Sequence, residues 1–419
     1  MTDPAASAPI HTQRRSRAFI LRYALAQTGA FISFIPLLTL LLPAKAEAIG
    51  GPAGAAVVLS QAAFWGGATA AIANLAFGAL SDRTRSPLGR RRPWIMGGVG
   101  GLLVSFALLT GASTPFSLVV GVIAFQLAVN AFFAPLNALV PDLVPDRQKG
   151  LVAAWAGIAA PFANLFTALV ISRLHPDVGL QFALVGAAVV LLVLPLLLRL
   201  EETAQASVGF TLSFRALKDR TFAAVWTSRL FAEAAIAIHT LYLFLWVSRA
   251  PPGVMPTGQS PAAVFGLLLA TATVSTVIAG FVGGVASDRL GRRLPFVIAA
   301  MVAMAASLVL LCIAPPWPGV LMIQLLFGAA HGLHATTVAA MTAEILPDRE
   351  SFGRDLGVMN VAIAVPQSLA PAAVLVLLGL GLPLATVFLM AGAFAVLSAG
   401  ALTFARVVRT PGTQSAPEH

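Results

Sequence analysis

Long apolar segments recur along the whole chain and constrain its fold more than any other feature. Twelve of them are long enough to cross a membrane, which takes about 20 apolar residues. They are residues 18–42, 56–80, 94–111, 115–140, 151–172, 179–199, 222–247, 261–286, 295–313, 318–343, 355–378 and 384–405. Because lipid offers no hydrogen-bond partners, each segment must satisfy its backbone groups within itself. The sequence therefore predicts an all-α membrane protein.

The composition excludes an ordinary soluble protein. Hydrophobic residues make up 58% of the chain and charged residues only 10%, whereas a soluble domain typically has about 25% charged residues. The net charge of +10 does not indicate a nucleic-acid partner, because the basic residues lie in short loops between the spans. The partner that we expect is the lipid bilayer.

A short basic phrase, Gly-x-x-Ser-Asp-Arg followed by Leu-Gly-Arg-Arg, occurs once in each half of the chain. The first copy covers residues 78–91 and the second covers residues 284–293. Gly89 and Gly291 are 202 residues apart, and so are the Pro-Asp-Arg phrases at residues 145–147 and 347–349. Two phrases in one register indicate a duplicated unit, which is typical of transporters.

The polar segments predict the domain limits. Residues 201–221 are the one sizeable polar connection between spans, and we interpret them as a cytoplasmic linker. Residues 18–200 and 222–406 would then form an N-terminal and a C-terminal bundle of six helices each. We expect residues 1–17 and 407–419 to be cytoplasmic tails.

The arginines and lysines predict the orientation. If the N-terminus is cytoplasmic, 20 of them lie in inside segments, and only Lys45, Arg173 and Arg249 lie in outside loops. This asymmetry follows the positive-inside rule. We therefore expect a multi-pass protein of the cell (inner or plasma) membrane with both termini in the cytoplasm.

The basic phrase resembles the signature loop of the major facilitator superfamily. Its expanded first copy, residues 81–94, and the end of the fourth span, residues 130–147, resemble the sucrose-type or glycoside–cation symporter branch. The resemblance implies twelve transmembrane helices in two pseudo-symmetric six-helix bundles, with spans 7 and 10 lining a central cavity. Symporters of that branch carry an acidic residue in the fourth span, where this chain has Asn130 and Asn137.

The resemblance also implies that the basic loops act as a conformational latch. Acidic side chains at helix ends pair with arginines and with the N-termini of neighbouring helices. The predicted latch residues are Asp82, Arg83, Arg90, Arg91, Asp142, Asp288, Arg289, Arg292 and Glu344. Asp146 and Asp348 are further expected partners of the arginines. The alternative is that these arginines only set the topology and bind anionic lipid.

Two charged residues lie well inside the seventh span. Arg229 and Glu233 are four residues apart and share one helical face. Because a charge inside a membrane is costly, such residues are functional candidates. We predict that Glu233 carries a coupling proton and that Arg229 is its partner. The alternative is a neutralised structural pair.

Polar side chains in the spans are candidates for solute recognition. Imidazole and amide groups donate and accept hydrogen bonds, which suits hydroxyl-bearing ligands. The predicted solute-binding residues are His331, His334, Gln126, Asn130, Asn137, Gln61 and Trp65. The alternative is that they hold the helices together. We expect no metal site, because no cysteine or carboxylate cluster supplies further ligands.

The sequence contains no phosphate-binding loop, metalloprotease helix or nucleophile elbow, and so we predict no enzyme activity and no cofactor. Energy would come from an ion gradient. We predict a monomeric secondary active transporter that moves a small organic solute, a sugar or glycoside, by proton-coupled alternating access. The alternatives are a proton-driven multidrug or metabolite exporter and a facilitator-like assembly factor.

Overall fold

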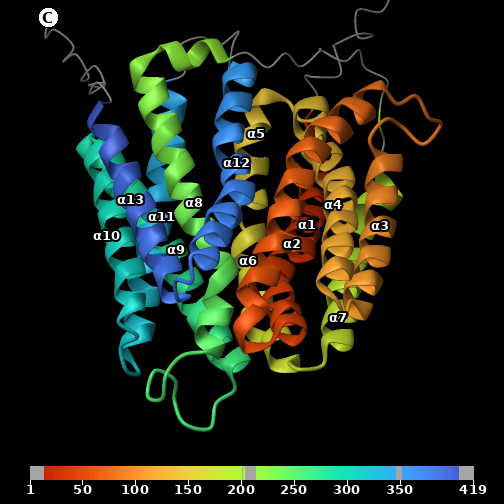
Figure 1. Cartoon of the computed structure of the whole chain (residues 1–419). Coiled ribbons are helices and arrows are strands. Elements are labelled where there is room, and N and C mark those ends of the chain that lie inside the picture. The colour runs from red at the N-terminus through yellow and green to blue at the C-terminus, as the bar shows by residue number, and fades with distance from the viewer. Residues whose placement is uncertain (1–13, 201, 203–213, 346–351, 405–419) are drawn as a thin grey trace, which may run out of the picture. The chain divides into compact units, whose positions relative to one another are not determined.

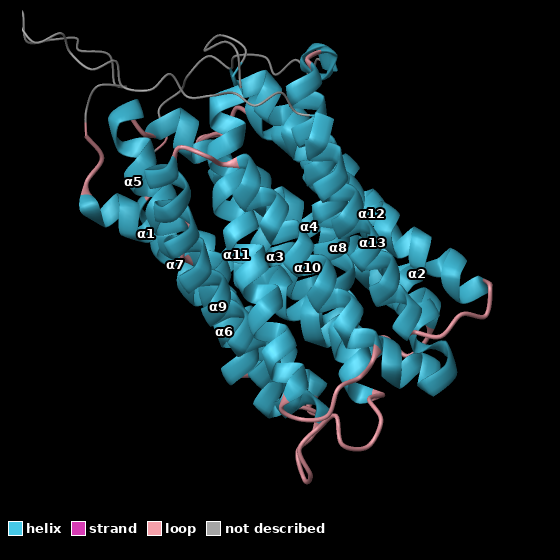
Figure 2. Ribbon diagram, turned by 90° about the vertical axis from the view of Figure 1, so that its left-hand side faces the viewer, coloured by secondary structure: helices cyan, strands magenta, loops and turns pink. Residues whose placement is uncertain are grey.

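The computed structural model describes residues 14–200, 202, 214–345 and 352–404. Within these ranges the chain consists of helices and loops, without a strand (Figure 2). This confirms the predicted all-α fold. The contacts divide the chain into two compact units, Met1–Gly209 and Phe210–His419 (Figure 1).

The first unit contains seven α-helices among the described residues. They are α1 (Arg17–Pro36), α2 (Leu42–Arg83), α3 (Arg92–Gly111), α4 (Pro115–Leu143), α5 (Asp146–Ala156), α6 (Ala159–Leu169) and α7 (Val178–Arg199). A π-helical turn, Leu37–Leu41, joins α1 to α2, and a 3₁₀ turn, Ile171–Leu174, follows α6. Helix α2 packs on α4, α3 packs on α4 and α7, and α1 packs on α6 and α7.

The continuous helical run from α1 through α2 covers two membrane crossings. It is 67 residues long, or about 100 Å at 1.5 Å per residue, roughly three times the thickness of a hydrocarbon core. It bends at Gly51, whose φ of 62° and ψ of −169° suit only glycine. Pro52 then starts the second crossing, where its missing N–H is not needed.

Eleven described helical segments are long and apolar enough to cross a membrane, and the first of them is this double run. Because the double run contains two crossings, the eleven segments give the twelve predicted crossings. The fifth predicted span differs in one respect, because it breaks between α5 and α6 at residues 157–158. Pro161 explains the break, since a proline cannot bond to the carbonyl four residues before it.

The second unit contains six α-helices among the described residues. They are α8 (Arg220–Ser248), α9 (Pro261–Leu290), α10 (Leu294–Cys312), α11 (Gly319–Ile345), α12 (Phe352–Gly379) and α13 (Ala385–Ala401). Short 3₁₀ turns, Phe214–Lys218 and Leu402–Phe404, lie at either end. Helix α9 packs on α11, α10 packs on α11 and α13, and α8 packs on α12 and α13.

Glycines bring α9 and α11 together backbone to backbone. A Cβ atom on Gly328 would overlap the backbone of Ala272, and one on Gly332 would overlap the carbonyl of Thr276. Small residues four positions apart allow this approach in membrane helices. The contact determines how α11 is placed against α9, and therefore where the side chains on the other faces of α11 lie.

Candidate functional site

The charged pair of α8 is present but loosely held. Arg229 Nε lies 3.8 Å from Glu233 Oε1, and both side chains are about four-fifths buried. This separation exceeds a hydrogen bond, and Arg229 Nε has no hydrogen-bond partner among the described residues. The four-residue spacing on a helix brings the two side chains to the same face. The pair therefore has unused capacity for a proton or a ligand.

A third polar residue of α8 connects it to α11. His239 Nε2 lies 3.1 Å from Gln324 Oε1, and the ring stacks on Phe327 with centroids 3.6 Å apart. His239 is buried. Gln324 was not predicted from the sequence, since the two residues are 85 positions apart. The amide Nε2 of Gln324 has no partner within the described part of the chain.

The two predicted histidines of α11 lie beside this group. His334 is 2% exposed, and its Nε2 atom is unpaired as far as the structure describes the chain. His331 lies near Phe327, with ring centroids 6.2 Å apart. Helix α8 thus carries Arg229, Glu233 and His239, and the neighbouring helix α11 carries His331 and His334, within one unit.

Amide side chains connect α1, α2 and α4 in the first unit. Gln27 Nε2 donates to Asn137 Oδ1 at 2.7 Å and to the hydroxyl of Tyr23 at 2.5 Å. Asn74 Nδ2 donates to Asn130 Oδ1 at 3.1 Å. Tyr23 was not predicted, and no local pattern in the sequence distinguishes it. These bonds hold neighbouring helices together, and their donors and acceptors can also be exchanged for those of a ligand.

The remaining predicted amides and the indole are less engaged. Asn130 Nδ2 donates to the backbone carbonyl of Gln126 at 2.8 Å, and the Gln126 side chain is half-buried. Gln61 and Trp65 lie on α2 and are exposed, and their side chains make no hydrogen bond to a described residue. Trp65 contacts Phe64 edge to face, with centroids 5.3 Å apart. The structure therefore does not join Gln61 or Trp65 to the other polar residues of the first unit.

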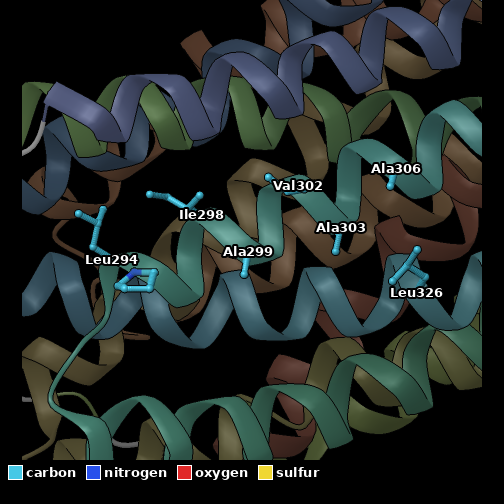
Figure 3. A pocket seen from close by; sticks show the side chains of 8 residues that line it. Leu294, Ile298, Ala299, Val302, Ala303, Ala306 and Leu326 are labelled. Carbon is cyan, nitrogen blue, oxygen red and sulfur yellow. The ribbon is translucent and has the colours of Figure 1, made fainter.

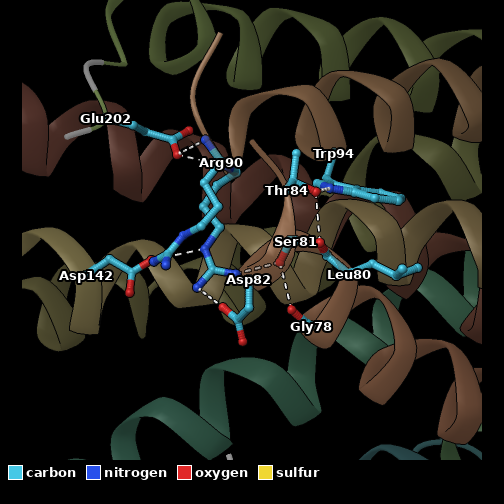
Figure 4. A network of polar contacts seen from close by, with 10 residues as sticks. Gly78, Leu80, Ser81, Asp82, Thr84, Arg90, Trp94, Asp142 and Glu202 are labelled. Atoms are coloured by element: carbon cyan, nitrogen blue, oxygen red, sulfur yellow. Dashed lines mark hydrogen bonds and ion pairs between the residues drawn. The ribbon is translucent and has the colours of Figure 1, made fainter. Parts of the chain in front are cut away.

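The first basic loop is organised around one buried arginine. Arg91 is 4% exposed. Its guanidinium lies 2.5 Å from Asp82 Oδ1 and 3.0 Å from Asp142 Oδ2, and it donates to Ser81 Oγ. Arg90 contacts the same Asp142 oxygen at 2.7 Å. The two carboxylates and the serine hydroxyl thus offset the cost of removing the guanidinium charge from water (Figure 4).

Glu202 caps the helix that follows this loop. Its carboxylate accepts the backbone N–H groups of Arg90, Arg91 and Arg92 at 2.6–2.7 Å. These groups lie at the N-terminus of α3, where a negative charge is favourable. The sequence analysis assigned Glu202 only to the linker. No signal in the sequence could have found the contact, because more than 100 residues separate the partners.

The second basic loop has the same pattern with more exposure. Arg293 Nε contacts Glu344 Oε1 at 2.6 Å, and Arg293 Nη1 contacts Asp288 Oδ1 at 2.8 Å. Partial burial alone would lower the pKa of Arg293. The hydrogen bonds and charges of Glu344 and Asp288 outweigh this effect and raise the pKa above its usual value. The guanidinium therefore stays charged.

Several predicted latch residues make no ion pair among the described residues. Arg83, Arg289 and Arg292 are exposed. Arg90 and Arg91 both contact Asp142, whereas in the repeat only Arg293, the equivalent of Arg91, contacts Glu344 among the described residues. Asp146 contacts Lys149 on its own helix turn at 2.7 Å. Asp348 lies outside the described residues.

Comparison with known proteins identifies the fold. The profile of the Major Facilitator Superfamily matches residues 19–260 and 250–419. A variant of the nucleoside transporter NupG has a TM-score of 0.72 at 13% identity, covering 92% of this chain and 99% of that one.

Two further structures are similar. A variant of the peptide transporter POT has a TM-score of 0.71 at 13% identity, covering 96% and 98%. A bacterial homologue of the human lysosomal transporter Spinster, in an inward-facing and occupied conformation, has a TM-score of 0.67 at 14% identity, covering 92% and 96%. A search of curated protein sequences gave no match.

Proposed function

Since this chain belongs to the Major Facilitator Superfamily, we propose that it is a secondary active transporter of a sugar or glycoside, coupled to protons. The family and the membrane-spanning helices support a transporter. The side chains inside the spans support the finer assignment of solute and ion. The arginine asymmetry of the loops supports a cell-membrane protein with both termini in the cytoplasm.

One observation carries the proposal. Three buried nitrogens on α8 and α11 have no hydrogen-bond partner among the described residues, namely Arg229 Nε, Gln324 Nε2 and His334 Nε2. A buried polar group left unpaired costs about 1–3 kcal/mol. Retaining three of them in one unit is reasonable if a bound solute supplies the oxygen atoms. A hydroxylated solute has many such oxygens, whereas an apolar drug has few.

Glu233 links this group to a proton. With its carboxylate charged, Glu233 attracts Arg229. With the carboxylate protonated, the guanidinium is free to bind a solute oxygen. The separation of 3.8 Å between Nε and Oε1 is short enough for attraction and too long for a hydrogen bond. We propose that proton and solute binding are coupled through this choice of partner.

The first unit has its own candidates for solute recognition. Asn137, which accepts from Gln27, and Asn130, which accepts from Asn74, can exchange these bonds for bonds to hydroxyl groups. Gln126, Gln61 and Trp65 are the further candidates, with the indole ring suited to the face of a sugar. His331 and His334 are the candidates in the second unit.

The basic loops are the proposed latch. Asp82, Arg91 and Asp142 in one loop and Asp288, Arg293 and Glu344 in the other are charge clusters built from equivalent residues. We expect Asp82→Asn to slow transport more than it weakens solute binding, because the substitution changes the balance of conformations. If Asp82→Asn reduced the transport rate and the solute affinity equally, the loop would serve only to set the membrane topology.

The experiment starts with a ligand screen. Purified full-length protein is heated with sugars, glycosides, nucleosides, peptides and drugs in turn, because a ligand of the folded state raises its apparent stability. The proposal expects stabilisation by a sugar or glycoside. Stabilisation by apolar drugs alone, together with transport out of the cytoplasmic side of vesicles, would make the protein an exporter.

Coupling is then measured in proteoliposomes with an imposed pH gradient. Glu233→Gln should abolish gradient-driven accumulation of the stabilising solute and keep its exchange. Glu233→Asp retains the acid and is the matched control, which should still accumulate solute. If Glu233→Gln accumulates solute as well as the wild type does, the pair with Arg229 is structural.

A further inference from the structure

An apolar groove runs along the outer face of α10. It has a volume of about 720 Å³, which is within the range of roughly 300–1,000 Å³ for small-ligand sites. Its lining residues are Leu294, Pro295, Ile298, Ala299, Val302, Ala303 and Ala306 of α10 and Leu326 of α11 (Figure 3). From Leu294 to Ala306 the groove follows about 18 Å of helix. One leaflet of the hydrocarbon core measures about 15 Å.

Small side chains open the groove. Ala299, Ala303 and Ala306 lie one helical turn apart, on the side of α10 away from its buried residues such as Met301 and Met304. Leu326 closes the far end from α11 (Figure 3). No polar side chain lines the groove, and so along this length it suits a hydrocarbon chain.

The end of the groove at Leu294 is basic. Arg289 and Arg292 lie within a few residues of it, are exposed, and make no ion pair with the residues that the structure describes. Arg293, which precedes Leu294 in the chain, already forms ion pairs with Glu344 and Asp288. Two free positive charges thus lie where the apolar groove begins.

The internal repeat shows what this end lacks. In the first copy, the carboxylate of Glu202 fills the N-terminus of α3. In the second copy, the N-cap residue Arg293 makes no capping bond with its own side chain, and the backbone N–H groups of residues 292–294 make no hydrogen bond to a described side chain. The residue at the equivalent position, 202 places after Glu202, is Phe404, which cannot accept a hydrogen bond. An anion from outside the chain can take the same place.

We propose that the second unit binds one anionic phospholipid along α10. Its phosphate lies at the N-terminus of α10 between Arg289 and Arg292, and one acyl chain follows the groove to Leu326. The helix dipole, the free N–H groups and the two guanidinium groups all favour a negative headgroup. The first unit has no equivalent site, because Glu202 is already bound there.

The test is native mass spectrometry of the full-length protein in detergent. The probes are dioleoylphosphatidylglycerol and dioleoylphosphatidylcholine, added at increasing concentration. We expect the first phosphatidylglycerol to bind more tightly than phosphatidylcholine. Each basic residue near an anionic lipid is worth about fivefold in affinity. Arg289→Ala and Arg292→Ala together should therefore lower the affinity for phosphatidylglycerol about 25-fold and remove the preference.

A groove-filling variant tests the acyl chain separately. Ala303→Phe should weaken the first bound lipid with either headgroup. Ala107→Phe, at an exposed alanine of α3, and Arg199→Ala, at an exposed arginine at the end of α7, are the matched controls and should change neither affinity. Arg292→Lys keeps the charge and should retain most of the preference.

Two results would overturn the proposal. One is unchanged phosphatidylglycerol binding in the double arginine variant when its thermal stability equals that of the wild type. The other is an unchanged affinity in Ala303→Phe while inorganic phosphate displaces the lipid, since the site would then bind a free anion and not a lipid.

Discussion

The two copies of the basic loop differ in burial, and so removing the equivalent arginine should have unequal effects. Arg91 has a side chain only 5% exposed, facing Asp82 at 31% and Asp142 at 22%. Arg293 is 22% exposed, facing Asp288 at 63% and Glu344 at 34%. Both contact two carboxylates, and so the contrast depends mainly on burial, with a hydrogen bond to Ser81 as a further contact of Arg91.

The expected magnitudes follow from burial. Removing one partner of a buried ion pair costs about 3–5 kcal/mol, because the other charge is left uncompensated. Arg90 still binds Asp142 when Arg91 is lost, and so we expect the lower end, about 3 kcal/mol, for Arg91→Ala. Exposed ion pairs contribute about 0–1 kcal/mol to the free energy of unfolding. We therefore expect Arg293→Ala to lower the stability by that amount.

The assay is thermal unfolding of the purified protein in detergent, followed by intrinsic tryptophan fluorescence. Trp94 donates to Thr84 in the first loop at 2.7 Å and reports on it locally. A unit of about 200 residues changes its midpoint by about 2–4 °C per kcal/mol. Arg91→Ala should lower the midpoint by about 6–12 °C, and Arg293→Ala by less than about 4 °C. Arg91→Lys should recover only part of the loss, because an ammonium cannot bridge both acids.

The dependence on burial is refuted if Arg293→Ala lowers the unfolding midpoint as much as Arg91→Ala does. It also fails if Arg91→Ala changes the midpoint by less than about 3 °C.

Three further predictions concern stability. Glu202→Gln should lower the midpoint by about 2–6 °C, since a neutral amide loses about 1–1.5 kcal/mol of charge-assisted bonding at the α3 N-terminus; an unchanged midpoint would contradict the cap. Gly332→Ala should destabilise the protein by about 1–3 kcal/mol, because a Cβ would overlap the Thr276 carbonyl. The control Gly97→Ala has open space around it and should leave the stability unchanged. Equal unfolding midpoints in the two variants would refute the close contact. Burial lowers the pKa of His175, although Glu47 opposes this, and so the unfolded state binds more protons and stability falls as pH drops through about 6.5. His175→Gln should lessen that fall between pH 7 and 5 in the same unfolding assay, and an unchanged profile would exclude the residue as its source.

The helices of this protein could be predicted from the sequence because apolar length is a local property. Each span needs only its own residues to satisfy its backbone. The proximity of Arg229 and Glu233 was predictable for the same reason, since a spacing of four residues on a helix fixes it. The repeat offset relates the arginines and acids of the two loops, but the sequence did not reveal that Arg293 and not Arg292 contacts Glu344.

The contacts between helices depend on packing, and so the sequence alone did not reveal them. Gln324 beside His239, Tyr23 beside Gln27 and Asn137, and Glu202 at the N-terminus of α3 all join different helices or a helix and the linker. Only side-chain register across the interfaces decides such partners. The sequence by itself determined the all-helical membrane architecture, the duplication and the list of polar groups inside the spans. The tertiary structure decided which of those groups bind each other and which lack a hydrogen-bond partner among the described residues, because hydrogen bonds depend on distances of a few tenths of an ångström that no local pattern encodes.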